Sequence, residues 1–426
     1  MSSIKVSIAG LGTVGQGLLS LLVEDRRFTR QGIDFDIAGV SARNRSTKRE
    51  PSIESYRWFD DPVELATDPE TDIFVELIGG ADGMAKAAVI AALEAGKPVV
   101  TANKALIAEH GPQLARLAEE KGVALKFEAA VAGGTPVVRG IRDGVAACTV
   151  KAVSGILNGT CNYILSTMAK DGRAFDDVLL EAQKLGYAEA DPTFDVDGID
   201  AAHKLVILAC LAFDAAIPMS AVSCEGIRGI TEGDVAAAKK LNMAIKLLAE
   251  AVLKDGKVAL RVTPALVPEA HSFAKAMGSE NVIIVDAEPL GRLGFNGPGA
   301  GAGATASAVA ADLCDIARGS IGPVYAAKAN LLGKLDYMSV DEIENPYFFR
   351  VLLKDEPGAL AAVAEALAAQ HISIESLRQP PSRKKGASVT IVTHPCRASA
   401  AKAVKQALAA HPFVEEAPSI LPIVTP

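Results

Sequence analysis

The sequence predicts an α/β protein of two or three domains, and three observations support this prediction. At 426 residues the chain is long enough for several domains, each with its own core. Half of the residues are apolar and only 5% are aromatic, a balance that suits an α/β enzyme. Short apolar strands alternate with helices through residues 1–130, which is the pattern of a parallel sheet covered by helices.

The first expected strand leads directly into a glycine-rich turn. Ile4 to Ala9 is followed by Gly10-Leu11-Gly12-Thr13-Val14-Gly15, and a helix is expected from there to Leu22. In this arrangement Gly10 allows a tight turn, Gly12 lets backbone approach a pyrophosphate, and Gly15 lets the helix pack on the strand. The helix N-terminus then faces the phosphates. An ordinary strand–helix turn is the alternative, but the flanking strand and helix favour dinucleotide binding.

The second expected strand, Phe35 to Val40, bears on which dinucleotide is bound. NAD-selective folds usually place an Asp or Glu at the end of this strand, where it contacts the ribose hydroxyls. Here the strand is followed by Arg43, with Lys48 and Arg49 beyond. A missing acid and a nearby arginine favour a 2′-phosphate, so we expect NADP, with NAD possible. The alternative is a basic surface loop.

Further strand–helix units complete a domain over residues 1–130. The expected elements are a strand at Asp72–Gly80, a helix at Ala85–Ala95, a strand at Lys97–Lys104, a helix at Gln113–Lys121 and a strand at Leu125–Ala130. In open parallel sheets ligands bind beyond the carboxyl ends of the strands. Thr101, Asn103 and Lys104 lie at such an end, so Lys104 is a candidate site residue. The domain is therefore predicted to be a nucleotide-binding domain of the Rossmann type.

A different pattern, expected to be an α+β domain, covers residues 131–330. Its expected elements are a strand at Thr149–Val153, helices at Ser154–Leu165, Asp176–Lys184 and Val235–Val252, and strands at Val258–Pro264 and Val282–Glu288. A second glycine-rich run, residues 297–305, precedes an expected helix at Ala306–Arg318, and no strand of the kind that leads into Gly10 closely precedes it. Its small residues permit close backbone approach to a cofactor or to another helix.

The most acidic stretch of the middle domain, Leu185–Lys204, allows three interpretations. Asp200 opens an expected helix and lies four residues before Lys204, so the two share one helix face. A solvated loop with a helix-capping acid is the simplest interpretation. A calcium loop is rejected, because Thr193 would occupy the first ligand position and Lys204 the place of the bidentate Glu. A polar substrate pocket, with carboxylates for an amine and a lysine for proton transfer, is the third.

The C-terminal region, residues 346–426, is expected to be a compact βαββαβ module. It follows a linker at Asn330–Asn345 and comprises Tyr347–Leu353, Asp355–Gln370, Ile372–Gln379, Ala387–Thr393, Ser399–Ala410 and Ser419–Val424. No candidate nucleophile or base stands out in it, so a regulatory role is expected.

Charge, cysteine usage and hydropathy exclude several classes of function. The net charge of −8 and the absence of a long basic run argue against nucleic acid as a partner. Six dispersed cysteines suit reduced thiols in a cytoplasmic protein better than disulfides or a zinc site. The longest apolar run, Leu205–Phe213, is too short to span a bilayer, and the chain begins in a strand rather than a signal peptide.

Five motifs in order resemble those of the homoserine dehydrogenase family with a C-terminal ACT domain. They are VELIGG (75–80), VVTANK (99–104), FEAAVAGGTP (127–136), GILNGTCNYIL (155–165) and GYAEADP with DGIDAAHK (186–204). The ACT resemblance rests on FFRVLLKDEPGALAAVAEAL (348–367) and on the topology of the module. The resemblance covers nearly the whole chain.

The resemblance implies an activity and a set of site residues. Members interconvert L-homoserine and L-aspartate 4-semialdehyde with NAD(P), in threonine and methionine biosynthesis. It implies that Lys204 donates the proton to the aldehyde oxygen and that Glu189 and Asp200 bind substrate. Lys104 would lie near the nicotinamide and substrate and would contact the cofactor. The cofactor site would include Thr13, Val14, Gly186 and Gly301.

The resemblance also implies a cation, an effector and an assembly. A monovalent cation, usually sodium, would bind at Glu128, Val131, Gly133 and Thr135, mostly through carbonyl groups. An amino-acid effector, threonine, would bind near Asp355–Gly358 and inhibit the enzyme. A homodimer or homotetramer is expected, and the enzyme is expected to be monofunctional. Two alternatives are another NAD(P) oxidoreductase of a small amino acid and a non-catalytic NADP-sensing ACT regulator.

Overall fold

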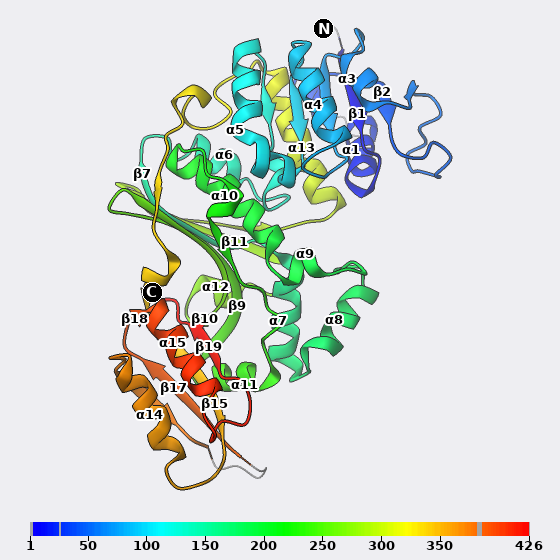
Figure 1. Ribbon diagram of the computed structural model, residues 1–426. Helices are drawn as coiled ribbons and strands as arrows, with labels where there is room; N and C mark the ends of the chain where they lie inside the picture. The colour runs from blue at the N-terminus through cyan, green and yellow to red at the C-terminus, as the bar shows by residue number, and fades with distance from the viewer. Residues whose placement is uncertain (1–2, 25–26, 381–385, 426) are drawn as a thin grey trace.

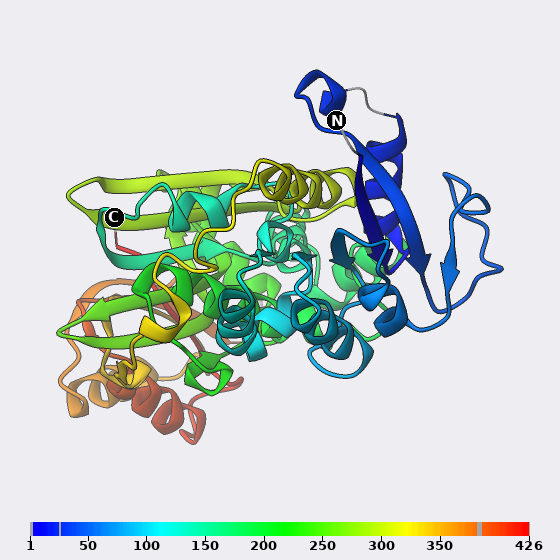
Figure 2. The same cartoon turned by 90° about the horizontal axis from the view of Figure 1, so that it is seen from above.

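The computed structural model describes residues 3–24, 27–380 and 386–425. Figure 1 shows the nucleotide domain at one end, a curved sheet in the middle and the ACT domain at the other end. In the view from above, the blue strands of the nucleotide domain lie at the right and the orange and red elements of the ACT domain at the lower left (Figure 2). The predicted fold class, an α/β protein with a Rossmann domain, a mixed middle sheet and a C-terminal ACT domain, is confirmed.

The nucleotide domain is a six-stranded sheet of parallel strands in the order β3-β2-β1-β4-β5-β6. The strands are β1 (Ile4–Ala9), β2 (Phe35–Ser41), β3 (Trp58–Phe59), β4 (Ile73–Glu76), β5 (Val99–Thr101) and β6 (Leu125–Lys126). The helices are α1 (Thr13–Glu24), α2 (Arg27–Arg30), α3 (Pro62–Thr67), α4 (Met84–Glu94) and α5 (Lys104–Lys121). The strand order reverses between β1 and β4, which is where such sheets bind ligands.

Helix α13 (Ala302–Ala317) returns from the middle region and packs against α1. Its Val309 and Leu313 join Leu18 and Leu19 in one buried cluster. A Cβ on Gly17 of α1 would lie 3.0 Å from the Ala302 carbonyl oxygen, so the end of the glycine-rich run packs closely on α1, one of its two expected uses. Strand β12 (Gly291–Pro298) leads into this run, but it is an antiparallel strand without a buried residue, unlike the buried parallel strand β1 before Gly10.

The middle domain is built on a sheet in the order β12-β11-β7-β9-β10-β13, with β8 paired to β10. Its strands are β7 (Thr149–Ile156), β8 (Val222–Cys224), β9 (Met243–Lys254), β10 (Lys257–Pro268), β11 (Glu280–Glu288), β12 (Gly291–Pro298) and β13 (Asp336–Tyr337). Its helices are α6 (Val137–Arg142), α7 (Gly159–Asp171), α8 (Phe175–Lys184), α9 (Thr193–Val196), α10 (Ile199–Phe213), α11 (Glu232–Lys240) and α12 (Ser272–Lys275). Short 3₁₀ turns lie at Glu128–Ala130, Met219–Ala221, Ala329–Leu331 and Val340–Glu342.

The helix expected at Val235–Val252 is wrong. Helix α11 ends at Lys240, Asn242 takes a positive φ of 56°, and β9 begins at Met243. Residues of β9 such as Lys246, Leu247 and Leu248 have good helical propensity, but the strand pairs with β10 along its whole length and with β7 as well. Tertiary pairing therefore overrides local propensity here.

Three other expected boundaries also differ from the structure. Ser154 to Ile156 extend β7 rather than opening a helix, and Asn158 caps α7. The strand expected at Leu125–Ala130 stops at Lys126 and becomes a 3₁₀ turn. Lys104 begins α5 rather than ending a strand.

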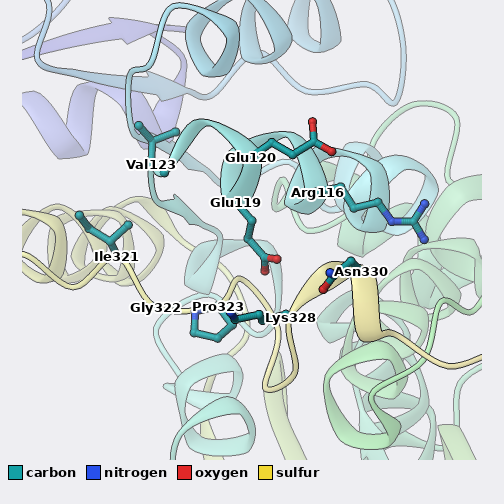
Figure 3. Close-up of a pocket in the computed structure, with 10 residues that line it drawn as sticks. Arg116, Glu119, Glu120, Val123, Ile321, Gly322, Pro323, Lys328 and Asn330 are labelled. Atoms are coloured by element: carbon teal, nitrogen blue, oxygen red, sulfur yellow. The ribbon is translucent and has the colours of Figure 1, made fainter.

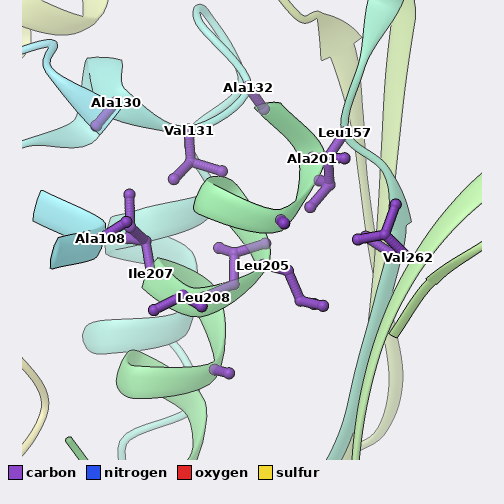
Figure 4. Packing of buried hydrophobic residues seen from close by; sticks show 14 of the residues in the cluster. Ala108, Ala130, Val131, Ala132, Leu157, Ala201, Leu205, Ile207, Leu208 and Val262 are labelled. Atoms are coloured by element: carbon purple, nitrogen blue, oxygen red, sulfur yellow. The ribbon is translucent and has the colours of Figure 1, made fainter. Parts of the chain in front are cut away.

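Helix α10 is buried over most of its length and forms the centre of the main core. Leu205, Ile207 and Leu208 pack among residues of the neighbouring turn and strands, as Figure 4 shows for Val131, Leu157 and Val262. Because α10 also carries Asp200 and Lys204, the site residues are fixed by a rigid, buried element.

The ACT module has the predicted βαββαβ order. Its antiparallel sheet runs β16-β17-β15-β19. Its elements are β15 (Tyr347–Leu353), α14 (Ala359–Ala369), β16 (Ile374–Arg378), β17 (Ala387–Thr393), β18 (Cys396–Arg397), α15 (Ala398–Ala409) and β19 (Ser419–Pro422), with β14 (Glu344–Asn345) pairing β18. No described helix is long and apolar enough to cross a membrane. All six cysteines are free thiols.

Candidate active site

The glycine-rich turn after β1 has the geometry that its sequence predicts. Gly10 has a φ of 101°, and a Cβ there would lie 2.3 Å from the Leu77 carbonyl oxygen. A Cβ on Gly15 would lie 2.1 Å from the Gly10 carbonyl oxygen, so the helix packs directly on the turn. A Cβ on Gly12 would meet nothing within 4 Å. The second glycine therefore faces open space, which is where a pyrophosphate would approach.

A cleft of about 820 Å³ opens beside this turn, at the carboxyl ends of β1 and β2. Gly10, Gly12 and Arg43 line it, and the Arg43 side chain is exposed. Arg49 is buried instead and donates hydrogen bonds to the carbonyl oxygens of Asn44 (2.8 Å) and Thr47 (3.0 Å). Arg49 thus fixes the loop that presents Arg43.

The other predicted cofactor residues lie on three different elements. Thr13 and Val14 form the first turn of α1, beside the cleft. Gly301 is the N-cap of α13 with a φ of 120°, and Gly186 follows α8 with a φ of 78°. Neither Gly186 nor Gly301 is among the described residues that line the cleft, so their contact with a cofactor stays a prediction.

A buried carboxylate, Asp200, joins two lysines from different elements. The Oδ2 atom of Asp200 accepts a hydrogen bond from Lys204 Nζ (2.8 Å), one turn along α10. Its Oδ1 atom forms an ion pair with Lys104, the first residue of α5. Asp200 is 2% exposed and Lys204 8%, whereas the Lys104 side chain is 35% exposed. The structure therefore brings together three of the four residues predicted for chemistry and substrate.

The strand–helix junction at Leu157 and Asn158 supports this cluster. Lys204 Nζ also donates to the Leu157 carbonyl oxygen (2.8 Å). The Asn158 amide donates to both Asp200 Oδ2 and Asp195 Oδ1, each at 2.8 Å. Neither Asn158 nor Asp195 received a role from the sequence. The GILNGTCNYIL motif contains Asn158, but nothing in its residue type or spacing indicated that it contacts Asp200.

Burial and charge shift the pKa values of this cluster in opposing ways. Burial alone would raise the pKa of Asp200, but the charges of Lys204 and Lys104 outweigh it and hold that pKa well below its usual range. Burial lowers the pKa of Lys204, and the charge of Asp200 only partly opposes this. Burial raises the pKa of Asp195. Asp200 is therefore ionised and Lys204 is an ammonium that gives up its proton more readily than a surface lysine.

The remaining acids of the Leu185–Lys204 stretch lie outside this cluster. Asp197 pairs with Arg228 (2.5 Å), and Asp191 accepts a hydrogen bond from the Thr193 backbone (3.1 Å). Glu189 is exposed, and its carboxylate makes no hydrogen bond or ion pair with a described residue. The predicted contact of Glu189 with substrate therefore stays a prediction.

The turn predicted to bind a cation has unused oxygen atoms. Thr135 Oγ1 is buried without a hydrogen-bond partner among the described residues. The carbonyl oxygens of Val131 and Gly133 likewise accept no hydrogen bond there. The Glu128 carboxylate accepts from the backbone N–H groups of Val138 and Arg139, both at 2.9 Å.

Arg139, beside this turn, is shared by three carboxylates. It contacts Glu128 (3.1 Å), Asp312 (3.1 Å) and Asp315 (3.3 Å). Burial, reinforced by the charge of Glu128, raises the pKa of Asp312 to about 7. Asp312 is therefore only partly ionised near neutral pH, and Glu128 and Asp315 supply the other negative charges beside Arg139.

A separate cavity of about 500 Å³ lies between the end of α5 and residues 321–330 (Figure 3). Its side chains include Arg116, Glu119 and Lys328. Glu119 accepts a hydrogen bond from the Ala329 backbone (2.9 Å), so the cavity borders a structural contact. It contains none of the predicted site residues.

Three family models match the chain. Residues 10–128 match the NAD-binding domain of homoserine dehydrogenase, residues 136–314 match homoserine dehydrogenase, and residues 347–413 match the ACT domain.

Named relatives agree with these matches. The homoserine dehydrogenase of Neisseria gonorrhoeae is 41% identical over 423 residues, covering 96% of this chain and 95% of the relative. A crystal structure of a homoserine dehydrogenase from Thiobacillus denitrificans superposes with a TM-score of 0.92 at 38% identity, covering 100% and 99% of the two chains. A hyperthermophilic archaeal homoserine dehydrogenase in complex with NADPH matches with a TM-score of 0.65 at 27% identity, covering 75% and 98%.

The full-length identity, the dinucleotide turn and the buried lysine–aspartate cluster lead to one assignment, which confirms the resemblance. The chain belongs to the homoserine dehydrogenase family and is an NAD(P)-dependent oxidoreductase that interconverts L-homoserine and L-aspartate 4-semialdehyde.

Proposed function

We propose that Lys204 transfers the proton in this reaction and that Asp200 holds it in place. The observation that carries the proposal is the buried Lys204–Asp200 pair. An ammonium has three N–H donors, and Lys204 gives two of them to Asp200 and the Leu157 carbonyl. The third remains for a substrate oxygen. The bound dinucleotide supplies or accepts the hydride, and an ammonium beside the carbonyl oxygen stabilises the negative charge that develops there.

Lys104 and Glu189 complete the proposed substrate site. Lys104 carries a second positive charge on the same carboxylate and is more exposed than Lys204, so it can reach substrate or cofactor. Its ammonium also lies 5.3 Å from the centre of the Phe194 ring. Because Asp200 already contacts both lysines and Asn158, its main role in this proposal is to orient Lys204. Glu189, on the exposed loop after α8, would hold the substrate ammonium.

The two directions of the reaction should depend on pH in opposite ways. Reduction of the aldehyde needs protonated Lys204, and oxidation of homoserine needs the neutral amine. As pH rises, reduction should slow and oxidation should accelerate. Because burial lowers the pKa of Lys204, this change should occur at a pH below the ordinary pKa of a lysine. Initial rates with NADPH and aspartate semialdehyde, and with NADP⁺ and homoserine, measure this. Profiles that do not mirror one another would remove Lys204 from proton transfer.

We also propose that NADP(H) is preferred over NAD(H). Exposed Arg43 lines the cleft beside the end of β2, and that strand end carries no acid. The archaeal relative binds NADPH. A guanidinium there would pair with the 2′-phosphate.

Arg43→Ala should raise KM for NADPH roughly 10- to 100-fold, since a hydrogen bond to a charged group contributes about 1.5–3 kcal/mol, and should leave KM for NADH almost unchanged. Arg45→Ala is the matched control, because the Arg45 guanidinium lies over the Trp58 ring (5.8 Å) and does not line the cleft. Equal effects of Arg43→Ala on both cofactors, or a wild-type preference for NADH, would contradict the proposal.

A monovalent cation, sodium, is proposed for the turn at Glu128, Val131, Gly133 and Thr135. Its support is the Thr135 hydroxyl and the two carbonyl oxygens, none of which has a hydrogen-bond partner among the described residues, together with the three carboxylates that contact Arg139. Hard oxygen ligands suit such an ion. Because this turn contacts the buried core at α10, its role would be structural.

Thr135→Val should therefore weaken sodium binding roughly fivefold, for the loss of about 1 kcal/mol. The measurement is Tm as a function of sodium concentration, with tetramethylammonium keeping the ionic strength constant. Thr71→Val is the control, because the buried Thr71 hydroxyl bonds Ser7 (2.6 Å) and should affect Tm equally at all sodium concentrations. A wild-type Tm that does not change with sodium concentration would contradict the proposed cation site.

The ACT domain is proposed to bind threonine as an inhibitor near Asp355–Gly358. Gly358, at the start of α14, is exposed and has a φ of 91°. Inhibition of NADPH oxidation by L-threonine measures this.

A cytoplasmic homodimer or homotetramer is also proposed. The free thiols support the compartment, and exposed Val252, Met277 and Leu290 on the middle domain support the assembly, which light scattering would measure.

A further inference from the structure

Glu76, the last residue of β4, is a carboxylate that has no access to solvent. Its Oε1 atom accepts hydrogen bonds from the backbone N–H groups of Ile78 (2.7 Å) and Gly79 (3.0 Å). Its Oε2 atom accepts a hydrogen bond from the hydroxyl of Thr101 (2.6 Å), the last residue of the neighbouring strand β5. Glu76 therefore joins the carboxyl ends of two adjacent strands, although it belongs neither to the dinucleotide turn nor to the lysine–aspartate cluster.

This carboxylate is buried without a counter-charge. Among the described residues it has three neutral hydrogen-bond donors and no basic side chain as an ion-pair partner. Burying a charge destabilises a protein unless the charge is paired, and neutral donors offset only part of that loss. Such departures from the rule occur mainly at functional sites. Glu76 also lies at the carboxyl edge of a parallel sheet, which is where ligands bind. Its burial therefore indicates a functional role.

Two polar residues connect Glu76 to the start of α5. The Thr101 hydroxyl accepts a hydrogen bond from the Asn103 backbone N–H (2.9 Å). The Asn103 side chain caps α5 by accepting from the Leu106 N–H (3.1 Å), and it donates to the Gly80 carbonyl oxygen (2.7 Å). The hydrogen bonds thus form a closed ring through the ends of β4 and β5, and the next residue along the chain is Lys104.

The loop held by Glu76 borders the dinucleotide cleft. Leu77 and Ile78 line the cleft, and Ile78 is 42% exposed, so its surface is available to a ligand. In the sheet order β2-β1-β4-β5, Arg43 follows β2 and Gly12 follows β1. A dinucleotide with its 2′-phosphate at Arg43 and its pyrophosphate at Gly12 extends toward β4 and β5. Its reacting end therefore lies on the side of the sheet where Lys104 begins α5.

We propose that Glu76 is a positioning residue for hydride transfer. In that step the aldehyde carbon accepts a hydride from the reduced dinucleotide and the aldehyde oxygen accepts one proton, giving the alcohol and the oxidised dinucleotide. Through Ile78 and Gly79, Glu76 fixes the loop beside the reacting end of the dinucleotide. Through Thr101 it fixes the start of α5, and with it Lys104. The inference rests on the role proposed above for Lys104 but not on proton transfer by Lys204.

The physical reason is the sensitivity of hydride transfer to geometry. A displacement of about 1 Å between reacting groups lowers a rate roughly 10²-fold. The loop beside the dinucleotide and the lysine beside the substrate come from different strands, and a single buried carboxylate holds both. Loss of one of its hydrogen bonds should therefore slow the hydride step more than it weakens dinucleotide binding.

Thr101 allows a test that separates its hydrogen bond from its packing. Thr101→Val keeps the shape of the buried side chain and removes the hydroxyl, whereas Thr101→Ser keeps the hydroxyl and removes a methyl group. Glu76→Gln keeps the shape and removes the charge. Asp68→Asn is the control: Asp68 is 7% exposed and accepts a hydrogen bond from the Glu70 N–H (3.0 Å), but it precedes β4 and so lies at the opposite edge of the sheet.

The measurements use the full chain and separate binding, chemistry and structure. Fluorescence of bound NADPH gives Kd. Single-turnover mixing of the enzyme–NADPH complex with aspartate semialdehyde gives the rate of NADPH oxidation, and NADPH deuterated at the transferred position shows by its isotope effect that this rate reports hydride transfer. Amide hydrogen exchange of the protein without dinucleotide reports the hydrogen bonds of Asn103 and Leu106, and Tm reports stability.

Thr101→Val and Glu76→Gln should lower the single-turnover rate roughly 10- to 100-fold, with Kd for NADPH within about threefold of wild type. Thr101→Ser should be roughly tenfold faster than Thr101→Val, and Asp68→Asn should stay within about threefold of wild type even if its Tm falls. Amide exchange at Asn103 should be faster in Thr101→Val than in Thr101→Ser. Rates that follow Tm across the four variants, equal exchange in the two Thr101 variants, or a loss of NADPH affinity without a loss of rate would each overturn the positioning role.

Lys104→Met distinguishes failure of this inference from failure of the role proposed for Lys104. A reduced rate in Lys104→Met with wild-type rates in Thr101→Val and Glu76→Gln would overturn the inference about Glu76 and keep the role of Lys104. A wild-type rate in Lys104→Met would refute the role of Lys104 and, with it, the connection through Thr101.

Discussion

Replacement of Lys204 by methionine should lower kcat by roughly 10²–10⁴-fold in both directions, which is the range expected for loss of a general acid–base group. The change removes the ammonium that contacts Asp200 and Leu157 but keeps a side chain of similar length in a site that is 8% exposed. The dinucleotide cleft lies beside β1 and β2, so cofactor affinity should not change.

Cofactor affinity can be measured independently through the single tryptophan. Trp58 donates its indole N–H to Asp60 (2.7 Å), which lines the cleft, so the fluorescence of Trp58 should respond to NADPH.

Lys246→Met is the matched control, because it also replaces a buried lysine by methionine. Lys246 is 2% exposed, bonds Asn162 (2.9 Å) outside the site, and has a pKa that burial lowers to about 8. Its loss should reduce stability by about 1–3 kcal/mol and leave kcat within a few-fold. Near-wild-type turnover of Lys204→Met would exclude Lys204 from the chemistry.

Elements with strong local signals were predictable from the sequence. In the turn at Gly10–Gly15, Gly10 has a positive φ, and both Gly10 and Gly15 lie too close to other backbone atoms for a side chain. Only glycine meets these needs, so the glycine pattern predicts the turn directly. Strand β9 is different. Its alanines, leucines and lysines have the propensity of a helix. Its strand conformation depends on pairing with β7 and β10, which the sequence of the segment alone does not reveal.

The site was predictable only in part, for a similar reason. Asp200 and Lys204 share a helix face, so their contact follows from spacing. The Lys104 contact joins residues 96 positions apart (200 minus 104), and the Asn158 contacts join a strand–helix junction to α9 and α10. No local pattern encodes such distances. The acids that the sequence left unassigned also separate in the structure. Asp195 belongs to the cluster, Asp191 accepts a hydrogen bond within its own loop, and Asp197 pairs with the distant Arg228.

Asp200→Asn should produce the second large effect, because it leaves two lysines facing each other without their counter-charge. Removing one partner of a buried ion pair costs about 3–5 kcal/mol, so Tm should fall clearly. The charge of Asp200 raises the pKa of Lys204 against the effect of burial, so its loss should lower that pKa further. The pH above which aldehyde reduction slows should therefore move to lower values. Loss of the Asp200 contact also misplaces the lysine, and such a displacement costs roughly 10²-fold in rate.

Asp195→Asn separates the charge effect from a general change in the pocket. Asp195 accepts a hydrogen bond from the same Asn158 amide but, among the described residues, makes no ion pair with either lysine. Its replacement should shift the pH profile less than Asp200→Asn does.

Stability provides a second measurement of the charge effect. Because the pKa of Asp200 is depressed in the folded state, the pair stabilises the protein above the ordinary pKa of an aspartate, and this contribution is lost as pH falls below it. The difference in Tm between wild type and Asp200→Asn should therefore be largest near neutral pH and shrink in acid. A difference that is constant with pH, together with an unshifted rate profile, would show that Asp200 does not act through its charge on Lys204.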